Sequence, residues 1–448
     1  MSIRFSLGID LGTTNSAIAL TDLESDHTEV LEITQIIGLN QIGEKPTLPS
    51  ALYIPHPNEF PQNSFGLPWD DGIGDSTIAG QFAREHGALV PDRLVTSAKS
   101  WLSNPHIDPR RPSLPWRSEI QEEKLSPFEC SRRYLAYLKN AFLYAGRVQG
   151  RNWDISETEI VLTVPASFDA VAQSLTADAA EAGGLGKVTL LEEPQAAFYA
   201  WIAQAGREWR SVISPGDIIL VCDVGGGTAD FSLIAVTDSS GTLELERISV
   251  GEHILLGGDN MDLALAYTLQ AKLEGERKSI DSWQFLALVH AASKAKIALF
   301  DDPSLLEVPI AVPSRGSSLF ARTVSTTLDR ATLDQVVLDG FFAKTRLSDL
   351  PQEARRAGLQ EFGLPFAADP IISKHLARFL CRSRANLNGS QSLSALVERQ
   401  LGPTEFVMPT AVLFNGGVFN SEPIRSRVLE LLASWNERKP VRELQGSE

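Results

Sequence analysis

Two stretches of the chain repeat the same order of apolar and polar positions. Each begins with an apolar run, passes through an aspartate and a turn that contains glycine and threonine, and ends in a second apolar run. The first stretch spans 5–20 and the second spans 218–234. Short apolar runs on both sides of such a turn predict a strand, a tight turn and a strand. Because the copies lie about half a chain apart, they predict a duplicated domain rather than a solenoid.

The second turn carries groups that suit a phosphate ligand. The glycines at 225–227 have no Cβ, so their backbone N–H groups can converge on an anion. Asp223 and Thr228 place a carboxylate and a hydroxyl beside these amides, which suits a hydrated Mg²⁺ carried by phosphates. Taken alone, this stretch has an alternative interpretation as a glycine-rich hairpin around one buried aspartate. The presence of the first stretch, with Asp10 at the corresponding place, favours a pair of turns that clamp a triphosphate.

Elsewhere, the apolar pattern alternates between strand-like and helix-like segments, which predicts an α/β protein. Glu192 and Glu193 end a predicted strand at a sheet edge where ligands collect, although a solvated pair of carboxylates on a loop is the alternative. A strand, two glycines and a helix over 410–435 place a helix N-terminus beside a ligand. The further predicted strands are 51–54, 159–165, 188–191, 243–249 and 410–414, and the predicted helices are 74–102, 126–148, 169–182, 195–205, 283–300 and 423–435.

Composition narrows the class of protein. The 448 residues carry a formal net charge of −16, which argues against general binding to nucleic acids or anionic membranes. The cysteines, Cys130, Cys222 and Cys381, form no CxxC pair, so neither a disulfide framework nor a zinc site is expected. There is no run of 18 apolar residues and no secretory pattern at the N-terminus, and we expect a cytoplasmic protein. Neither a Walker A motif nor GxGxxG is present.

Taken together, these motifs resemble those of a known family. The chain resembles the ATPase domain of the 70-kDa heat-shock (DnaK-type) chaperones, within the actin and sugar-kinase superfamily. Residues 8–16 match that family's first phosphate motif, and 223–230 match its second, with Ala229 where an aromatic residue is usual. Residues 165–168 resemble its proline switch, and 192–197 resemble its N-E-P-T-A-A segment. The resemblance runs from about residue 5 to about residue 432, in the expected motif order.

The resemblance implies duplicated ribonuclease-H-like (actin-like ATPase) domains that form two lobes around a nucleotide cleft, each with a smaller inserted subdomain. The implied boundaries are 1–37 and 127–212 for the core of lobe I, 38–126 for its insertion, 213–257 and 326–435 for the core of lobe II, 258–325 for its insertion, and 436–448 for a tail.

The same resemblance implies a site for ATP or ADP with Mg²⁺, and K⁺ as a further candidate ion. Asp10, Glu193 and Asp223 would hold Mg²⁺ through water, and Thr228 would contact phosphate. Lys99 would lie by the γ-phosphate and orient the attacking water, whereas a lone lysine near a helix start is ordinarily solvated. The residues implied to bind the nucleotide are Gly12, Thr13, Thr14, Asn15, Gly225, Gly226, Gly227, Gly257, Gly258, Lys296, Gly416, Gly417 and Val418.

Family membership would also bring partners. It implies a J-domain co-chaperone and a nucleotide-exchange factor, with no nucleic acid and no membrane. The family's closing helix, hydrophobic linker and peptide-binding domain are not found in these 448 residues, so we expect a truncated form of a longer protein. Client peptides would then bind only through the missing domain.

Three motifs depart from the family pattern. Gln173 stands where an arginine relays to the substrate domain, so coupling between domains is in doubt. In the adenosine helix, Ser293 and Phe300 replace a glutamate and a serine. The segment 416–423 lacks the arginine that stacks on adenine, and Phe419 or Phe300 would have to stack instead. Losing one cation–π contact costs roughly 1–2 kcal/mol, so we expect a weakened site for adenine nucleotides.

Three functions remain open at this point. The first is a slow ATPase module of a DnaK-type chaperone that changes lobe closure with its nucleotide. The second is an interaction module that binds nucleotide without hydrolysing it. The third is a small-molecule kinase of the same superfamily, with an aspartate as general base. Turnover stimulated by a metabolite would favour the kinase, and tight binding without turnover would favour the interaction module.

Overall fold

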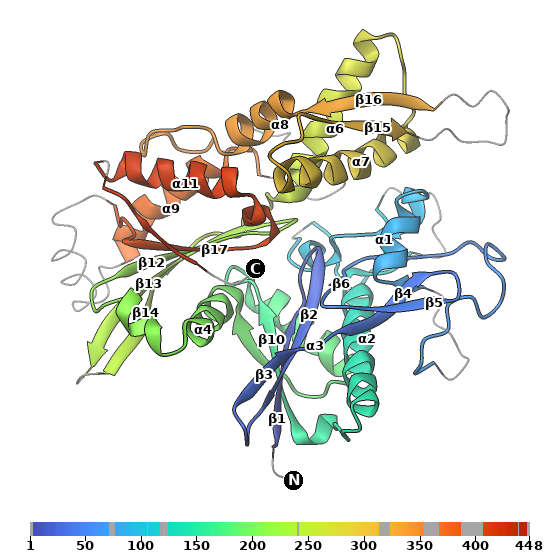
Figure 1. Cartoon of the computed structure of the whole chain (residues 1–448), viewed down its shortest axis with the longest axis horizontal. Helices are drawn as coiled ribbons and strands as arrows, with labels where there is room; N and C mark the ends of the chain where they lie inside the picture. Colours follow the sequence, from blue (N-terminus) through green and yellow to red (C-terminus); the bar gives the residue numbers. More distant parts are fainter. Residues whose placement is uncertain are drawn as a thin grey trace. The chain divides into compact units, whose positions relative to one another are not determined.

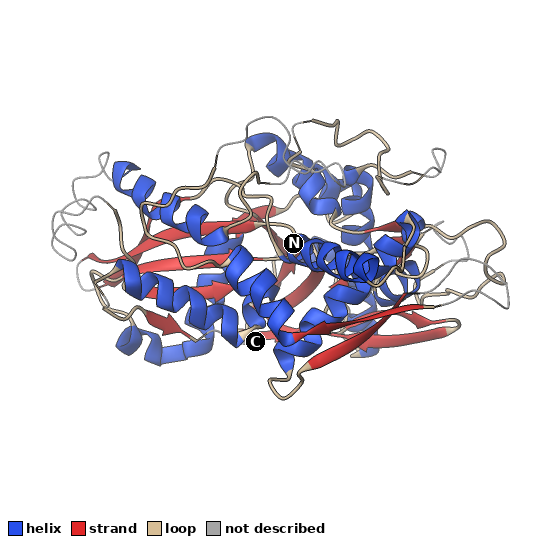
Figure 2. Cartoon of the chain, turned by 90° about the horizontal axis from the view of Figure 1, so that it is seen from above, coloured by secondary structure: helices blue, strands red, loops and turns tan. Residues whose placement is uncertain are grey.

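The computed structural model describes residues 3–70, 77–104, 106–116, 118, 124–239, 242–312, 323–352, 367–386, 406–437 and 439–445 (Figure 1). The chain divides into two compact units, of which the first ends at Glu193 and the second begins at Pro194. Each unit contains one larger mixed sheet with helices beside its strands (Figure 2). In the part of the chain that the structure describes, no helix has the length and hydrophobicity needed to cross a bilayer.

The first unit is built around strands β1 (Phe5–Asp10), β2 (Asn15–Asp22), β3 (His27–Val30), β10 (Thr158–Val164) and β11 (Thr189–Glu192), with β6 (Leu48–Pro49) paired to β2. The order in the sheet is β11-β10-β1-β2-β3. β1, β2 and β3 pair antiparallel, whereas β1, β10 and β11 pair parallel. Alternate side chains of β1 are buried, so the period-two pattern in the sequence places one face of the strand in the core.

Two helices of this unit begin where the sequence predicts them. α2 (Pro127–Val148) starts after Ser126, whose hydroxyl accepts the Glu129 amide at 3.0 Å. α3 (Ala170–Ala182) starts after Asp169, whose carboxylate accepts the Ala172 amide at 2.8 Å. Each side chain satisfies one of the amides that a helix N-terminus leaves without a partner.

The helix predicted over 74–102 is largely wrong. The described part of this segment contains the short strands β8 (Ile78–Ala79) and β9 (Leu94–Val95), the helix α1 (Gln81–Gly87), and the 3-10 helices η1 (Pro91–Arg93) and η2 (Ala98–Trp101). Gly80 and Ser97 adopt positive φ angles of 87° and 55°, which interrupt a helix. β7 (Leu52–Tyr53) pairs with both strands, and β4 (Ile33–Gly38) forms a hairpin with β5 (Gln41–Lys45).

The second unit repeats the topology of the first. Its sheet contains β12 (Ile218–Val224), β13 (Ala229–Ser239), β14 (Thr242–Val250), β17 (Ala411–Asn415) and β18 (Arg442–Leu444), in the order β14-β13-β12-β17-β18. β12, β13 and β14 pair antiparallel, whereas β12, β17 and β18 pair parallel. β12 and β17 are therefore the counterparts of β1 and β10.

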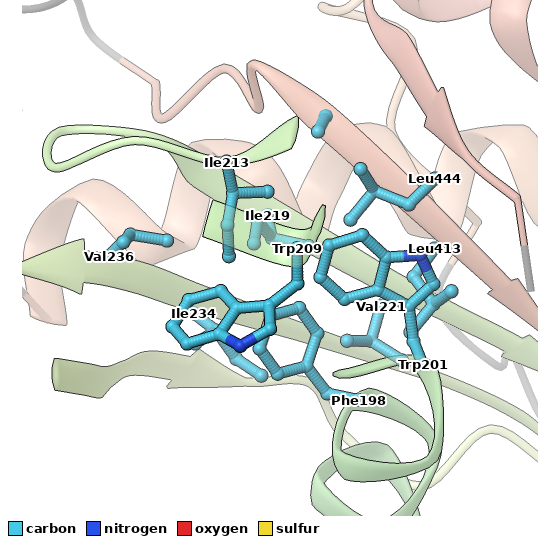
Figure 3. Packing of buried hydrophobic residues seen from close by; sticks show 11 residues of the cluster. Phe198, Trp201, Trp209, Ile213, Ile219, Val221, Ile234, Val236, Leu413 and Leu444 are labelled. Atoms are coloured by element: carbon cyan, nitrogen blue, oxygen red, sulfur yellow. The ribbon is translucent and has the colours of Figure 1, made fainter. Parts of the chain in front are cut away.

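Helices and a two-stranded sheet complete the second unit. The remaining elements are α4 (Glu193–Ala205), which begins at the last residue of the first unit, η4 (Gly206–Glu208), α5 (Trp209–Val212), α6 (Gly258–Gly275), α7 (Ser282–Asp301), β15 (Glu307–Val312), β16 (Val324–Asp329), α8 (Arg330–Val336), the π-helix η5 (Val337–Phe341), α9 (Ile372–Asn386), the 3-10 helix η7 (Gly417–Asn420) and α11 (Glu422–Trp435). Phe198 and Trp201 of α4 pack with Trp209 against Ile219 and Val221 of β12 (Figure 3). This aromatic layer covers one face of the sheet.

The strand β18 falls in the segment that the sequence predicts as a tail. Leu444 is 2% exposed and belongs to the same hydrophobic cluster (Figure 3). Arg442 Nη2 donates to Asp217 Oδ2 at 2.7 Å, and Thr410 Oγ1 donates to Asp217 Oδ1 at 2.7 Å. The Ser214 amide also donates to Asp217, at 2.8 Å. Asp217 thus links the last strand to the beginning of β12.

Replacing Asp217 with asparagine is expected to lower the free energy of unfolding at pH 7 by about 2 kcal/mol, since hydrogen bonds to a charged group are lost. Burial alone would raise the pKa of this carboxyl group, but the hydrogen bonds and the charge of Arg442 outweigh it and hold the pKa below its ordinary value. A lowered folded-state pKa stabilises the fold fully above the unfolded-state pKa, near 3.9, and this contribution is lost as the pH falls from there through the folded-state pKa. Urea unfolding at pH 7 and near pH 3 would measure the difference, and an equal loss at both pH values would contradict the prediction.

Candidate functional site

The first glycine turn joins β1 to β2. Asp10 is exposed at the end of β1, and its Oδ1 accepts a hydrogen bond from Thr163 Oγ1 at 2.8 Å. A Cβ added to Gly12 would lie 2.0 Å from the carbonyl oxygen of Asn15, so only glycine fits this turn. Ser50 fixes the turn through two hydrogen bonds. Its hydroxyl donates to the Gly12 carbonyl at 2.7 Å, and its amide donates to the Thr14 carbonyl at 2.9 Å.

The backbone amides of this turn differ from its carbonyls in their hydrogen bonding. Among the described residues, no acceptor takes a hydrogen bond from the amides of Gly12, Thr13 or Thr14. Backbone amides in a tight turn are strong donors and usually find a partner. A row of three without one, beside a carboxylate, suits an anion that carries a cation.

The first unit also brings together two residues that the family resemblance implicates in catalysis. Lys99 lies on η2, and Glu193 directly follows β11. Their side chains form an ion pair, with the lysine side chain 7% exposed and the glutamate side chain 17% exposed. Lys99 is therefore not the solvated lysine that its residue type alone would predict.

The second glycine turn joins β12 to β13. The Gly225 amide donates to the Thr228 carbonyl at 3.0 Å. The Gly225 carbonyl accepts from the Gly258 amide at 3.0 Å, and the Gly226 carbonyl accepts from the Asp259 amide at 2.7 Å. The first amides of α6 therefore donate hydrogen bonds to the carbonyls of this turn. Within the described ranges, the amides of Gly226, Gly227 and Thr228 donate to no acceptor, so this turn repeats the arrangement of the first.

The nucleoside residues predicted in the second unit lie close to this turn. Lys296 Nζ donates to the Gly258 carbonyl at 3.3 Å and pairs with Asp262 Oδ1 at 2.7 Å. A Cβ built on Gly258 would lie 3.5 Å from both Lys296 Nζ and a methyl group of Val418. Asn260 Oδ1 accepts the Gly257 amide at 2.8 Å and closes the start of α6. α6, α7 and η7 therefore meet at the second glycine turn.

Asp223 is held by the last residue of β17, Asn415, and by Gly416, which follows it. Asn415 Nδ2 donates to Asp223 Oδ2 at 2.7 Å. Gly416 has a φ of 86°, and a Cβ there would lie 2.6 Å from Asp223 Oδ1 and 2.4 Å from the Val224 carbonyl oxygen. Sequence reasoning names Gly416 but misses Asn415 and Thr163. Both lie on the parallel neighbour of a hairpin strand, next to its aspartate, and no local sequence signal shows this pairing.

One prediction about the adenine side is wrong. Phe419 is 3% exposed, and its ring packs against Phe414 at 4.6 Å and Phe342 at 6.3 Å between ring centroids. It belongs to the core and cannot stack on a base. Phe300 is half-buried on α7 and remains a prediction for this role. Gln173, which replaces the relay arginine, donates through Nε2 to the Phe168 carbonyl at 3.1 Å, within the predicted switch segment.

The carboxylates are suited to a cation held through water rather than directly. Among the described residues, no group of three His, Cys, Asp or Glu side chains is placed to hold a metal ion. Asp10 and Asp223 each have a hydrogen-bond donor on one oxygen and stand beside unoccupied amides. Within each unit, a carboxylate placed in this way fits a water of a hydrated Mg²⁺ that arrives with phosphates, because Mg²⁺ keeps several waters in such sites.

Comparison with known proteins identifies similar chains. A family model described as Hsp70 protein matches residues 81–349. The chaperone protein HscA homologue of Mannheimia succiniciproducens is 31% identical over 318 residues, which cover 67% of this chain and 43% of the relative. The HscA homologue of Vibrio cholerae serotype O1 (strain M66-2) is 31% identical over 310 residues, and the chaperone protein HscA of Yersinia enterocolitica is 31% identical over 316 residues. The match spans less than half the length of these relatives.

Proposed function

Because the chain belongs to the Hsp70 protein family, we propose that it is a nucleotide-binding module of a chaperone that binds ATP with Mg²⁺ and hydrolyses it slowly. The observation that carries this proposal is the repeated turn. Each unit presents an aspartate with a hydrogen-bond donor on one oxygen beside three consecutive amides without an acceptor in the described chain. In the fold of this family, such turns would bind the phosphates.

Each residue has a defined role in this proposal. The amides of 12–14 and 226–228 would donate to phosphate oxygens, and Asp10, Glu193 and Asp223 would hold the waters of Mg²⁺. Bound Mg²⁺ would supply charge neutralisation for the transferring phosphoryl group. Lys99 would contribute its positive charge to the same transition state and orient the attacking water. Catalysis of this kind depends on positioning more than on covalent chemistry.

The nucleoside would lie against the start of α6, with Gly257, Gly258, Lys296 and Val418 around it. The proximity of Lys296 and Val418 to Gly258 supports this placement. Because Phe419 is buried in the core, the base would have to be held without that ring. We therefore expect weaker affinity for adenine nucleotides than a site with a stacking arginine would give.

The chaperone role is the wider part of the proposal. The matched relatives are named as chaperones, and the chain would act like them through a change in lobe closure between nucleotide states. A J-domain co-chaperone and an exchange factor are proposed partners, in the cytoplasm, with K⁺ as an additional ion. Client peptides would bind through a domain that lies outside these residues.

One observation favours a second candidate, a module that binds nucleotide without hydrolysing it. Lys99 is already paired with Glu193, so the charge that it would offer to a phosphate is partly neutralised. The glutamine at position 173 would further weaken communication with a substrate domain. In this alternative, nucleotide would fix a conformation for partners to recognise.

Calorimetry with ATP and Mg²⁺, together with single-turnover phosphate release on the same sample, tests the proposal. Binding with slow release would support the ATPase function. Binding without release would favour the non-hydrolysing module. No binding, in a sample whose folding has been verified by circular dichroism, would contradict both.

Replacing Asp10 with asparagine is expected to weaken Mg²⁺-dependent nucleotide binding about tenfold, because a carboxylate that orders the waters of the ion is lost. The affinity measured in EDTA should stay close to that of the unaltered chain. Asp26→Asn is a matched control, since Asp26 is exposed on the turn beyond β2. Unchanged affinity in both conditions would remove Asp10 from the site.

A further inference from the structure

Asn415 and Thr163 hold the two aspartates at equivalent places in the two sheets. In the second unit, β12 and β17 pair with Asp223 opposite Asn415. In the first unit, the register of β1 and β10 ends with Ile9 opposite Leu162, so the next positions are Asp10 and Thr163. Each donor therefore extends from the parallel neighbour of the hairpin strand, at the residue opposite the aspartate.

The two donors are different chemical groups that make the same contact. Asn415 donates an amide hydrogen to Asp223 at 2.7 Å, and Thr163 donates a hydroxyl hydrogen to Asp10 at 2.8 Å. A hydrogen bond to a carboxylate is stronger than one between neutral groups and favours the ionised form. It also restricts rotation of the carboxyl group, so that the other oxygen keeps a fixed direction.

The second unit restricts its aspartate from both sides. Asn415 binds Oδ2, and the α-carbon of Gly416 lies so close to Oδ1 that a methyl group there would be 2.6 Å away. The sheet itself does not need the Asn415 side chain, because β12 and β17 are already joined by backbone pairing. The side-chain contact therefore acts on the carboxylate and adds little to strand pairing.

We infer that Asn415 and Thr163 are positioning residues that fix Asp223 and Asp10 for the hydration shell of the nucleotide-bound Mg²⁺. This inference rests on the proposed function, because it assigns these residues to the same site. Residues that orient metal-binding carboxylates commonly change metal affinity by about 10-fold to 100-fold when they are replaced. For an ion held through water, we expect the lower end of this range.

The test is a Mg²⁺ titration of the binding of a fluorescent ADP analogue to the full chain. Asn415→Leu and Thr163→Val remove the donors and keep similar volumes. Each should raise the Mg²⁺ concentration at half-maximal binding about tenfold and leave the affinity in EDTA unchanged. Thr189→Val is the matched control, since the Thr189 side chain is exposed on the neighbouring strand β11.

A rescue variant separates positioning from a purely structural role. Asn415→Thr places in the second unit the hydroxyl donor that the first unit uses at the equivalent position, so it should recover most of the Mg²⁺ response. Thermal unfolding without ligand should be similar for all variants. If Asn415→Leu unfolds at the assay temperature, Thr163→Val and Asn415→Thr still decide the question.

The outcomes distinguish this inference from the proposed function. Mg²⁺-dependent binding by the unaltered chain, with the same midpoint in Asn415→Leu and Thr163→Val, would overturn the inference and leave the proposed function standing. A loss that appears equally in EDTA, or that Asn415→Thr does not recover, would also overturn it. Failure of the unaltered chain to bind nucleotide would overturn both.

Discussion

Replacing Lys99 with alanine is expected to slow single-turnover ATP hydrolysis by about two to three orders of magnitude while changing nucleotide affinity little. A preorganised donor aimed at developing charge contributes a factor of this size when it is removed. Lys99 is suited to the role because its side chain is 7% exposed, and an ammonium group that is shielded from water interacts more strongly with phosphate. Ground-state binding would rest mainly on the backbone amides, which the substitution leaves in place.

The ion pair with Glu193 gives this prediction a second readout. The Glu193 side chain is 17% exposed in the ion pair, and without Lys99 its carboxylate becomes freer to interact with the waters of Mg²⁺. In Lys99→Ala, the Mg²⁺ concentration at half-maximal nucleotide binding should therefore stay the same or fall slightly, while the rate of hydrolysis drops. Phosphate release and nucleotide binding should be measured on the same sample.

Lys45→Ala provides the matched control for Lys99→Ala. Lys45 is exposed on β5, in the same predicted insertion, and its removal should change neither quantity. If Lys99→Ala hydrolyses ATP at the rate of the unaltered chain, the lysine has no catalytic role. If both hydrolysis and binding are lost, Lys99 supports the structure of the site rather than the reaction.

Local patterns predicted the parts of the fold that depend on local chemistry. The two hairpins, the start of α2 at Ser126 and the start of α3 at Asp169 follow from apolar alternation and from side chains that cap helices. The helix expected over 74–102 was wrong because Gly80 and Ser97 take positive φ angles, which apolar periodicity does not reveal. β18 was missed because three residues are too few to show a period, and its pairing with β17 is a long-range contact.

In the candidate site, too, the residues set by local chemistry could be predicted, and those set by long-range contacts could not. The aspartates and glycines could be found from their repeated order, because the turn itself imposes those residue types. Asn415 and Thr163 could not, since their role depends on which strands become neighbours and in which register. The burial of Phe419 was also invisible, because its partners Phe342 and Phe414 come from separate elements. The assignment of Lys99 came from the family resemblance, as residue type alone indicates a solvated lysine.

Replacing Gly416 with alanine is expected to lower the free energy of unfolding by about 3 kcal/mol. Gly416 has a φ of 86°, a conformation that strains any residue with a Cβ, by roughly 1–3 kcal/mol. The added methyl group would also lie 2.4 Å from the Val224 carbonyl oxygen and 2.6 Å from Asp223 Oδ1. Overpacking of this kind typically adds about 1–3 kcal/mol. Urea unfolding of the purified chain measures the sum.

The neighbouring glycine is the control for this substitution. Gly417 has no positive φ, and among the described residues no atom lies within 4 Å of an added Cβ. Gly417→Ala should therefore change the free energy of unfolding by less than about 1 kcal/mol, and it can stabilise the fold by restricting the unfolded chain. Two adjacent alanine substitutions are thus expected to differ several-fold in their effect. Equal effects would mean that the contact of Gly416 with β12 is not as close as the geometry indicates.

Gly416→Ala also connects stability to the proposed function. The end of β12 can relieve the contact with the new methyl group by moving the Asp223 carboxylate, and this movement would break its hydrogen bond with Asn415. Folded Gly416→Ala should then need more Mg²⁺ for nucleotide binding, as Asn415→Leu does, while Gly417→Ala should not. A destabilised variant with an unchanged Mg²⁺ response would show that the backbone of β12 moves while the Asp223 carboxylate keeps its position. The requirement for glycine at 416 would then belong to the fold alone.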